Sequence, residues 1–475
     1  MKNLSDSELT IAKQDKWLRV LPYGIAGLFF LAYLSFLKSI DVWTDEAYMM
    51  QMLRETNTLK DAVLYAASDT HPPAYFVALK MVTMIFGQNL VAAKMLSIGA
   101  VTGTILLGVH FLLQERGVKS AIFYALLVGA IPCSMDFSVE IRMYSLALFF
   151  LTGCGINAFR FITTEKKRYL VACTLFGVGA AYTHYFSLAA VALILGMMFC
   201  VLIVTNRKLL KYWIVSIVIC IALYIPWLPY FYVQFTRVST GFWIPEITGR
   251  TLLEYLEWYF GTDMPYCVWM LAAVMLVAIV LLIGEVIVER NRRTVWACAC
   301  FLVWFLTIVV GVVVSAAIRP MFLIKYSYPM LGLLSIALAW ALHRLPERTA
   351  LVLMCFLFCI GIVDYENTYQ TEYESTMTVK TMQFFEENLK EGDKVAYNYH
   401  AFGFIYRFYF TEEQLVELSD IDFEQEDGDA DIYLMHTTWN ELPSTEQLAA
   451  NGWKQEYMGM YGIEHNEFKI FHYYK

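Results

Sequence analysis

Residues 41–76 read DVWTDEAYMMQMLRETNTLKDAVLYAASDTHPPAYF, and they directly follow a first apolar run at residues 18–40. This stretch places Asp45, Glu46 and His71 next to a segment that is long enough to cross a bilayer. Ionised side chains lose their hydration in hydrocarbon, so at a bilayer edge they are stable only in the wet interface. The stretch therefore predicts a polar site at a membrane surface.

The two adjacent carboxylates have two readings. In the first, Asp45 and Glu46 act in a site together with His71. In the second they only start a helix, because Thr44 can serve as its N-cap and acidic residues in a first turn complement the helix dipole. The same three side chains could ligate a divalent ion, but ligands spread over a loop have no metal-specific spacing. We expect no obligatory metal and no other obligatory cofactor.

Composition assigns the chain to the membrane proteins. Of its 475 residues, 59% are hydrophobic and only 16% are charged, so most of its surface cannot face water. The sequence contains about eleven apolar runs that are long enough to span a bilayer. They lie at 18–40, 90–113, 121–137, 143–163, 169–185, 186–204, 213–230, 266–288, 295–317, 326–343 and 349–364. We predict an α-helical polytopic membrane protein, with a transmembrane module over 1–364 and a juxtamembrane loop at 41–89.

Basic residues predict the orientation of these spans. Lysines and arginines lie before the first span and between later ones, at 13–19, 166–168, 207–211, 290–293 and 343–344. The positive-inside rule places all of them in the cytoplasm if the N-terminus is cytoplasmic. The loop 41–89 and the chain after residue 364 then lie outside the cytoplasm. We expect the short segment 72–87, which carries Lys80, to be re-entrant or interfacial.

The composition becomes that of a soluble domain over residues 365–475. The spacing predicts an amphipathic helix over 376–391 and a second helix capped by Ser444. We expect strands at 394–399, at 431–435 and within 453–474. These elements predict a small extracytoplasmic α/β domain. It contains no nucleophile elbow, phosphate loop or metal signature, so we expect it to support the site or recognise the acceptor. The net charge of -8 argues against nucleic acid as a partner.

Seven short motifs carry a family resemblance through their order. They are TDEAY (44–48), DTHPPAYF (69–76), SVEIRMYSL (138–146), AYTHYFSL (181–188), IPWLPYF (225–231), GFWI (241–244) and RPMFLIKYSYP (319–329). In this order they resemble the membrane glycosyltransferases of the GT-C superfold, in particular the family 39 group. That group includes protein O-mannosyltransferases and is related to aminoarabinose transferases. The resemblance covers about residues 17–364, and residues 365–475 resemble the variable soluble tail of bacterial members.

The resemblance implies inverting transfer of a sugar from a polyprenyl-phosphate donor, held in the membrane lipid, to an acceptor at the outer face of the cytoplasmic membrane. The acceptor is a cell-envelope lipid, a glycan or a protein. Its hydroxyl must lose a proton as it attacks, and Asp45 is the expected general base, with Glu46 as an orienting neighbour or alternative base. The leaving phosphate gains negative charge, which fixed cations stabilise. The expected phosphate-binding residues are Arg142, Arg319, Lys325 and His71, and the expected substrate-binding residues are Tyr144, His184, Trp243 and Tyr326.

The chain departs from the family pattern at two positions. Lys325 and Lys94 stand where relatives tend to carry arginine, which keeps the charge but loses the fork geometry of the guanidinium. Structural alternatives stay open for several residues. They are interfacial anchoring for Arg142, snorkelling for Arg319 and Lys325, capping of the next helix for His71, and a helix-end hydrogen bond for His184.

The alternative function is a transporter or flippase of a lipid-linked substrate. Such proteins contain internal repeats and broken helices with charges near the bilayer midplane. The sequence contains no convincing repeat, and its unusual polar residues gather at one predicted face. The sequence therefore favours a glycosyltransferase over a transporter or flippase.

Overall fold

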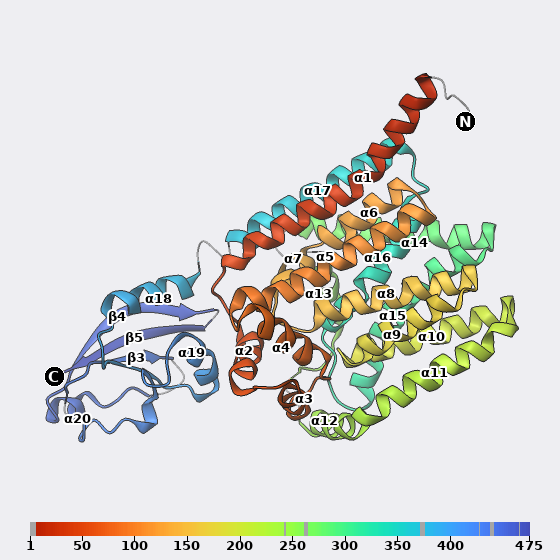
Figure 1. Cartoon of the computed structure of the whole chain (residues 1–475). Helices are drawn as coiled ribbons and strands as arrows, with labels where there is room; N and C mark the ends of the chain where they lie inside the picture. Colours follow the sequence, from red (N-terminus) through yellow and green to blue (C-terminus); the bar gives the residue numbers. More distant parts are fainter. Residues whose placement is uncertain are drawn as a thin grey trace. The chain divides into compact units, whose positions relative to one another are not determined.

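The chain folds into two compact units in a computed structural model (Figure 1). The first unit comprises Met1–Leu37 and Thr58–Asn367, and the second comprises Lys38–Asn57 and Thr368–Lys475. Residues 6–241, 244–260, 265–370, 376–426, 428–437, 441–464 and 466–475 are described by the structure.

The first unit is built from helices. In chain order they are α1 (Asp6–Ser35), α3 (Leu59–Ser68), α4 (Ala74–Phe86), α5 (Leu90–Glu115), α6 (Val118–Gly129), α7 (Pro132–Val139), α8 (Tyr144–Thr164), α9 (Lys167–Ala181), α10 (Tyr185–Thr205), α11 (Leu210–Tyr224), α12 (Leu228–Thr240), α13 (Gly249–Phe260), α14 (Pro265–Glu289), α15 (Arg292–Ala317), α16 (Leu331–Leu342) and α17 (Glu347–Tyr369). The short 3-10 helix η4 (Ile324–Met330) leads into α16. Helices α1 and α17 run side by side (Figure 1), and the Ser35 and Tyr365 hydroxyls lie 3.0 Å apart.

The helices of the first unit include the membrane spans that the apolar runs predict. Eight stretches in the described part of the chain are long and apolar enough to cross a bilayer, and a ninth is possible if the bent pair α6 and α7 forms one span. The fold class of a polytopic helical membrane protein is confirmed. The difference from the expected eleven lies mainly at 169–185 and 326–343, where α9 and α16 have only 15 and 12 residues. All residues of α16 are buried, so its apolar sequence reflects packing inside the protein.

The predicted re-entrant segment 72–87 forms the 13-residue helix α4. At 1.5 Å per residue this helix is about 20 Å long, shorter than a hydrocarbon core of about 30 Å. Its length agrees with the expectation that the segment does not cross the bilayer completely.

Small residues let α8 and α16 approach closely. A Cβ atom on Gly332 of α16 would lie 1.9 Å from Thr152 Oγ1 of α8, and one on Gly155 would lie 2.3 Å from Leu333 Cδ2. Such close packing of small residues is typical of helix pairs in membranes. It places the start of α8 beside η4, the two segments that carry Tyr144 and Tyr326.

The second unit is an α/β domain with a five-stranded sheet. The strands are β1 (Lys394–Tyr397), β2 (Leu415–Glu417), β3 (Ile432–His436), β4 (Lys454–Ile463) and β5 (Asn466–Tyr474), in the order β2-β1-β3-β5-β4. Strand β1 is parallel to β2 and β3, whereas β5 is antiparallel to β3 and β4. The helices are α2 (Thr44–Glu55), α18 (Met377–Asn388), α19 (Gly403–Tyr409) and α20 (Thr445–Ala450).

The core of this unit consists of apolar side chains from the sheet and from α20. It contains Ala396, Ile432, Leu434, Leu448, Trp453 and Tyr473. The expected helix over 376–391 and the expected strands are present. Ser444 occupies the predicted N-cap position of α20, but its side chain makes no capping hydrogen bond.

Candidate active site

A short turn between α3 and α4 holds His71 beside an aspartate. His71 Nδ1 lies 3.0 Å from Asp69 Oδ2, and both side chains are largely buried. Burial raises the pKa of Asp69, but the charge and hydrogen bond of His71, followed by the charge of Arg142, lower it below its usual value. Asp69 therefore stays ionised and fixes the orientation of the imidazole. Asp69 was not among the residues predicted from the sequence, although its position two residues before His71 was an available signal.

Three hydrogen bonds to backbone carbonyls connect this turn and its flanking helices to other helices. The Ala74 N–H donates to the Tyr182 carbonyl at 2.8 Å. Gln234, which is buried in α12, donates to the Ala66 carbonyl at 2.8 Å and also reaches the His71 carbonyl at 3.4 Å. Gln234 was also missed, because it lies after the predicted span at 213–230 and no sequence pattern singles it out.

His184 lies close to His71 and caps α10. Their ring centroids are 6.0 Å apart, and His184 is only 3% exposed. Its Nδ1 accepts a hydrogen bond from the Phe186 N–H at 3.3 Å, so the neutral ring carries its proton on Nε2. Burial, followed by the charges of His71, Arg142 and Lys325, lowers the pKa of His184 well below its ordinary value. The helix-end hydrogen bond expected as an alternative is therefore present, at a position that also faces the predicted site.

Aromatic rings and two cations complete this cluster. The Tyr326 ring lies 5.1 Å from His184 and 6.2 Å from Tyr144, which itself lies 5.7 Å from His184. Lys325 Nζ lies 5.7 Å from the centre of the Tyr144 ring. Arg142, directly before α8, is 4% exposed and acts electrostatically on His184. We call these residues with His71 and Asp69 the His184 cluster. It joins positive charge to aromatic surface, a combination suited to an anionic group attached to an apolar or sugar moiety.

Arg319 makes its contact elsewhere. Its Nη1 donates to the Thr240 carbonyl at 2.9 Å, at the end of α12. This contact holds the Arg319 guanidinium at a helix end, and its phosphate-binding role stays a prediction. Lys94, the other departure from the family pattern, is buried in α5. Trp243 lies outside the described residues.

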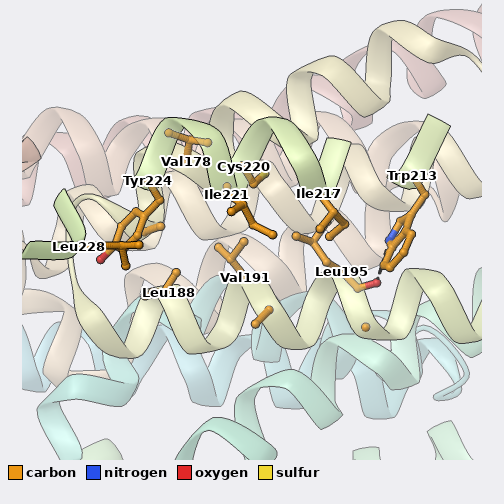
Figure 2. Close-up of a pocket in the computed structure, with 14 residues that line it drawn as sticks. Val178, Leu188, Val191, Leu195, Trp213, Ile217, Cys220, Ile221, Tyr224 and Leu228 are labelled. Atoms are coloured by element: carbon orange, nitrogen blue, oxygen red, sulfur yellow. Dashed lines mark hydrogen bonds between the residues drawn. The ribbon is translucent and has the colours of Figure 1, made fainter. Parts of the chain in front are cut away.

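An apolar groove begins one helical turn after His184. Figure 2 shows Leu188, Val191 and Leu195 of α10 facing a row of side chains from α11. The groove has a volume of about 430 Å³, and the Trp213 indole N–H donates to the Leu195 carbonyl at 3.0 Å at its far end. A second apolar groove of about 630 Å³ lies between α4, α5 and α8.

The two candidate carboxylates belong to the second unit, in the first turn of α2. Glu46 is 6% exposed, and its carboxylate accepts a hydrogen bond from the Trp43 N–H at 3.3 Å. Glu46 thus fulfils the helix-starting role. Thr44 is the first residue of the helix and Trp43 is the N-cap, so the expected Thr44 cap is wrong by one position. Asp45 is half-buried.

Within the described residues, no group of three or more His, Cys, Asp or Glu side chains is placed to hold a metal ion. That the protein needs no obligatory metal stays a prediction. That Asp45, Glu46 and His71 could bind a divalent ion stays an untested alternative.

Known structures are similar to this chain in fold. A scan against protein-family models and a search of curated proteins found no match. Crystal structures of ArnT from Cupriavidus metallidurans, in the apo state and bound to undecaprenyl phosphate, are 13% identical and align with TM-scores of 0.62 and 0.61. Each alignment covers 96% of this chain and 97% of the other. An apo oligosaccharyltransferase from Archaeoglobus fulgidus aligns with a TM-score of 0.47 and 10% identity over 85% of this chain and 65% of that one. ArnT is an aminoarabinose transferase of the GT-C type. The chain therefore has the GT-C fold.

Proposed function

We propose that this protein transfers a sugar from a polyprenyl-phosphate donor to a hydroxyl-bearing acceptor, with inversion, at the outer face of the cytoplasmic membrane. The observation that carries the proposal is the His184 cluster, in which the buried Arg142, the partly buried Lys325 and aromatic rings adjoin an apolar groove in a GT-C fold. The ArnT structure that contains undecaprenyl phosphate supports a lipid of this class as the donor carrier.

The cluster provides what the departing lipid phosphate requires. As the bond between the anomeric carbon and the phosphate oxygen breaks, the phosphate gains negative charge. Arg142 supplies a planar guanidinium and Lys325 a point charge, while Asp69 holds the ring of His71 in place. His184 is neutral and donates through Nε2. Fixed charges of this kind stabilise the transition state more than the bound donor, which is the condition for catalysis.

Asp45 is the proposed general base. It accepts the proton of the acceptor hydroxyl while the acceptor oxygen bonds to the anomeric carbon from the face opposite the phosphate. The polyprenyl phosphate leaves with the bonding electron pair, and the configuration at the anomeric carbon is inverted. Glu46 is committed to the helix start and acts as a neighbour that supports α2.

The groove along α10 is the proposed site of the donor's isoprenoid chain. Its lining is apolar, and Leu188 lies one turn from His184, so a chain in the groove would bring its phosphate towards the cluster. Gly196 lies in this groove and Gly99 in the second groove, and a Cβ atom at either position meets no other atom within 4 Å. Gly196→Phe should raise the KM for the donor, whereas Gly99→Phe should not.

The positive-inside pattern supports a cytoplasmic N-terminus and an extracytoplasmic second unit. The experiment that tests the function is release of labelled sugar from a panel of polyprenyl-phosphate sugars by the purified protein in liposomes. We expect turnover with at least one donor, its loss in Asp45→Asn with donor binding retained, and weaker donor binding in Arg142→Gln. Arg250→Gln, on an exposed helix face, is the matched control. Lipid movement without turnover of any donor would support the flippase alternative instead.

A further inference from the structure

The second unit contains a polar cavity between α2 and α19. Its volume is about 410 Å³. Ala47, Gln51 and Glu55 line it from one face of α2, since they are spaced four residues apart. Arg407, Phe408 and Glu412 line it from α19 and the residues that follow.

Specific contacts hold these two walls together. Arg54 Nη1 donates to the Arg407 carbonyl at 2.7 Å, and Nη2 reaches the Phe408 carbonyl at 3.4 Å. The Arg54 guanidinium also lies 5.5 Å from the centre of the Phe408 ring. The Tyr409 hydroxyl bonds to the backbone just before α2, at Ile40 and Val42. The cavity is therefore defined by ordered contacts between segments more than 350 residues apart in sequence.

A second polar cavity adjoins the first. It has a volume of about 390 Å³ and shares Arg407 and Glu412 with its neighbour. Its other walls include Tyr397, Glu417 and Asp420. The two cavities together form what we call the α2–α19 groove, with the exposed side chains of Arg407 and Glu412 at their junction.

The charged side chains of the groove indicate which class of ligand it can bind. Four carboxylates face it, from Glu55, Glu412, Glu417 and Asp420. Among the described residues that line the groove, two are arginines, and Arg54 already binds backbone carbonyls. A phosphate or another polyanion would meet a surplus of like charge.

A carbohydrate suits this lining. Each sugar hydroxyl both donates and accepts, so it can bridge a carboxylate and a guanidinium. The partly exposed ring of Phe408 offers an apolar surface for the C–H groups of a sugar ring. An amino group on the sugar would also be favoured by the surplus of carboxylates.

We propose that the α2–α19 groove binds a neutral or amino-bearing oligosaccharide, and that this glycan is the acceptor. The proposal rests on the proposed transferase function for the acceptor role. Ala47 lines the end of the groove at the first turn of α2, the helix that carries the proposed base Asp45. Because residues two apart lie on nearly opposite sides of a helix, the acceptor must extend past this first turn to reach Asp45. The second unit then recognises the acceptor and positions the base through the same helix.

Binding of oligosaccharides to the full-length protein in nanodiscs tests the proposal without requiring turnover. The probes are maltotetraose, chitotetraose, the chitosan tetramer and the anionic tetragalacturonate. We expect a neutral or amino-bearing probe to bind and tetragalacturonate not to bind. Arg407→Ala and Glu412→Ala should each weaken binding by about tenfold, the effect of losing one hydrogen bond to a charged group.

Lys380→Ala on α18 and Glu446→Ala on α20 are the matched controls, because both side chains are exposed and lie outside the groove. The proposal is overturned if no neutral or amino-bearing probe binds, or if only tetragalacturonate binds. Equal effects in groove and control variants would also overturn it. Release of the donor sugar, either to water or to a bound probe, is measured in the same preparations and separates the two proposals. Its absence with every donor refutes the transferase, while the binding data test the groove independently.

Discussion

Removal of a single hydroxyl group, in Tyr409→Phe, tests whether the C-terminal residues position the proposed base. The Tyr409 O–H donates to the Ile40 carbonyl at 3.2 Å and accepts from the Val42 N–H at 3.1 Å. These backbone groups precede α2, whose second residue is Asp45. Burial, followed by the charge of the Asp41 carboxylate, raises the pKa of Tyr409 far above its usual value, so the hydroxyl keeps its proton at any physiological pH.

The magnitude follows from these two hydrogen bonds. Each contributes about 1 kcal/mol net, so the contacts that hold the start of α2 lose about 2 kcal/mol. Val42 is 0% exposed, and its N–H would have no water to replace the lost partner. Phenylalanine keeps the packing of the ring. A loss of about 2 kcal/mol is about thirtyfold in an equilibrium constant, and a base misplaced by about 1 Å can slow a reaction about a hundredfold. We expect kcat to fall by between about tenfold and about thirtyfold.

The assay measures kcat and the donor KM for Tyr409→Phe in liposomes, with thermal unfolding to show that the variant is folded. Donor binding should be unchanged, because Tyr409 belongs to the second unit and the proposed donor residues to the first. Tyr457→Phe is the control, since this side chain is 53% exposed on β4. If kcat of Tyr409→Phe equals that of Tyr457→Phe while Asp45→Asn is inactive, the C-terminal residues do not position the base.

Two further predictions concern stability. In the unfolded chain His184 takes up a proton near pH 6.5, whereas in the folded protein its pKa is well below that value. The free energy of unfolding should therefore decrease as the pH falls below about 6.5. His184→Asn keeps a side-chain acceptor that can cap the helix but has no titrating ring. Between about pH 7.5 and about pH 5, its unfolding temperature should fall less than that of the wild type. Equal decreases in the two proteins would refute the role of His184 in this pH dependence. Glu285 is buried and paired with Arg116 at 2.5 Å, so Glu285→Ala should destabilise the protein by about 3 kcal/mol in denaturant unfolding. Glu347→Ala, at an 89% exposed carboxylate paired with Lys119, should change little, and similar effects of the two variants would contradict the importance of burial.

Sequence patterns predicted the helical membrane architecture because apolar run length and composition are local properties. They overestimated the number of spans because a helix buried inside the protein, such as α16, is as apolar as one that faces lipid. The expected strands of the second unit were found, whereas β2 was not predicted, since three residues are too few for a periodic pattern.

The sequence predicted which residues belong to the candidate site, but it did not predict which side chains and helices contact one another there. The motifs pointed to His71, His184 and Tyr326, whose proximity the structure shows. The partnership of Asp69 with His71 and the packing of α2 on α19 were not predicted. The first needs side-chain geometry, and the second joins segments that are far apart in sequence, for which one sequence carries no signal.

The association of residues 38–57 with the C-terminal residues has a consequence during synthesis. Tyr409, which bonds to the backbone before α2, is made 369 residues after Ile40. At about 5–20 residues per second the ribosome needs about 20–70 s to cover that distance. A helix of 12 residues is marginal on its own, and Arg54 of α2 lacks its partners in α19 until that helix has been made. The segment that carries the proposed base therefore lacks its folded partner until the last fifth of the chain has been translated.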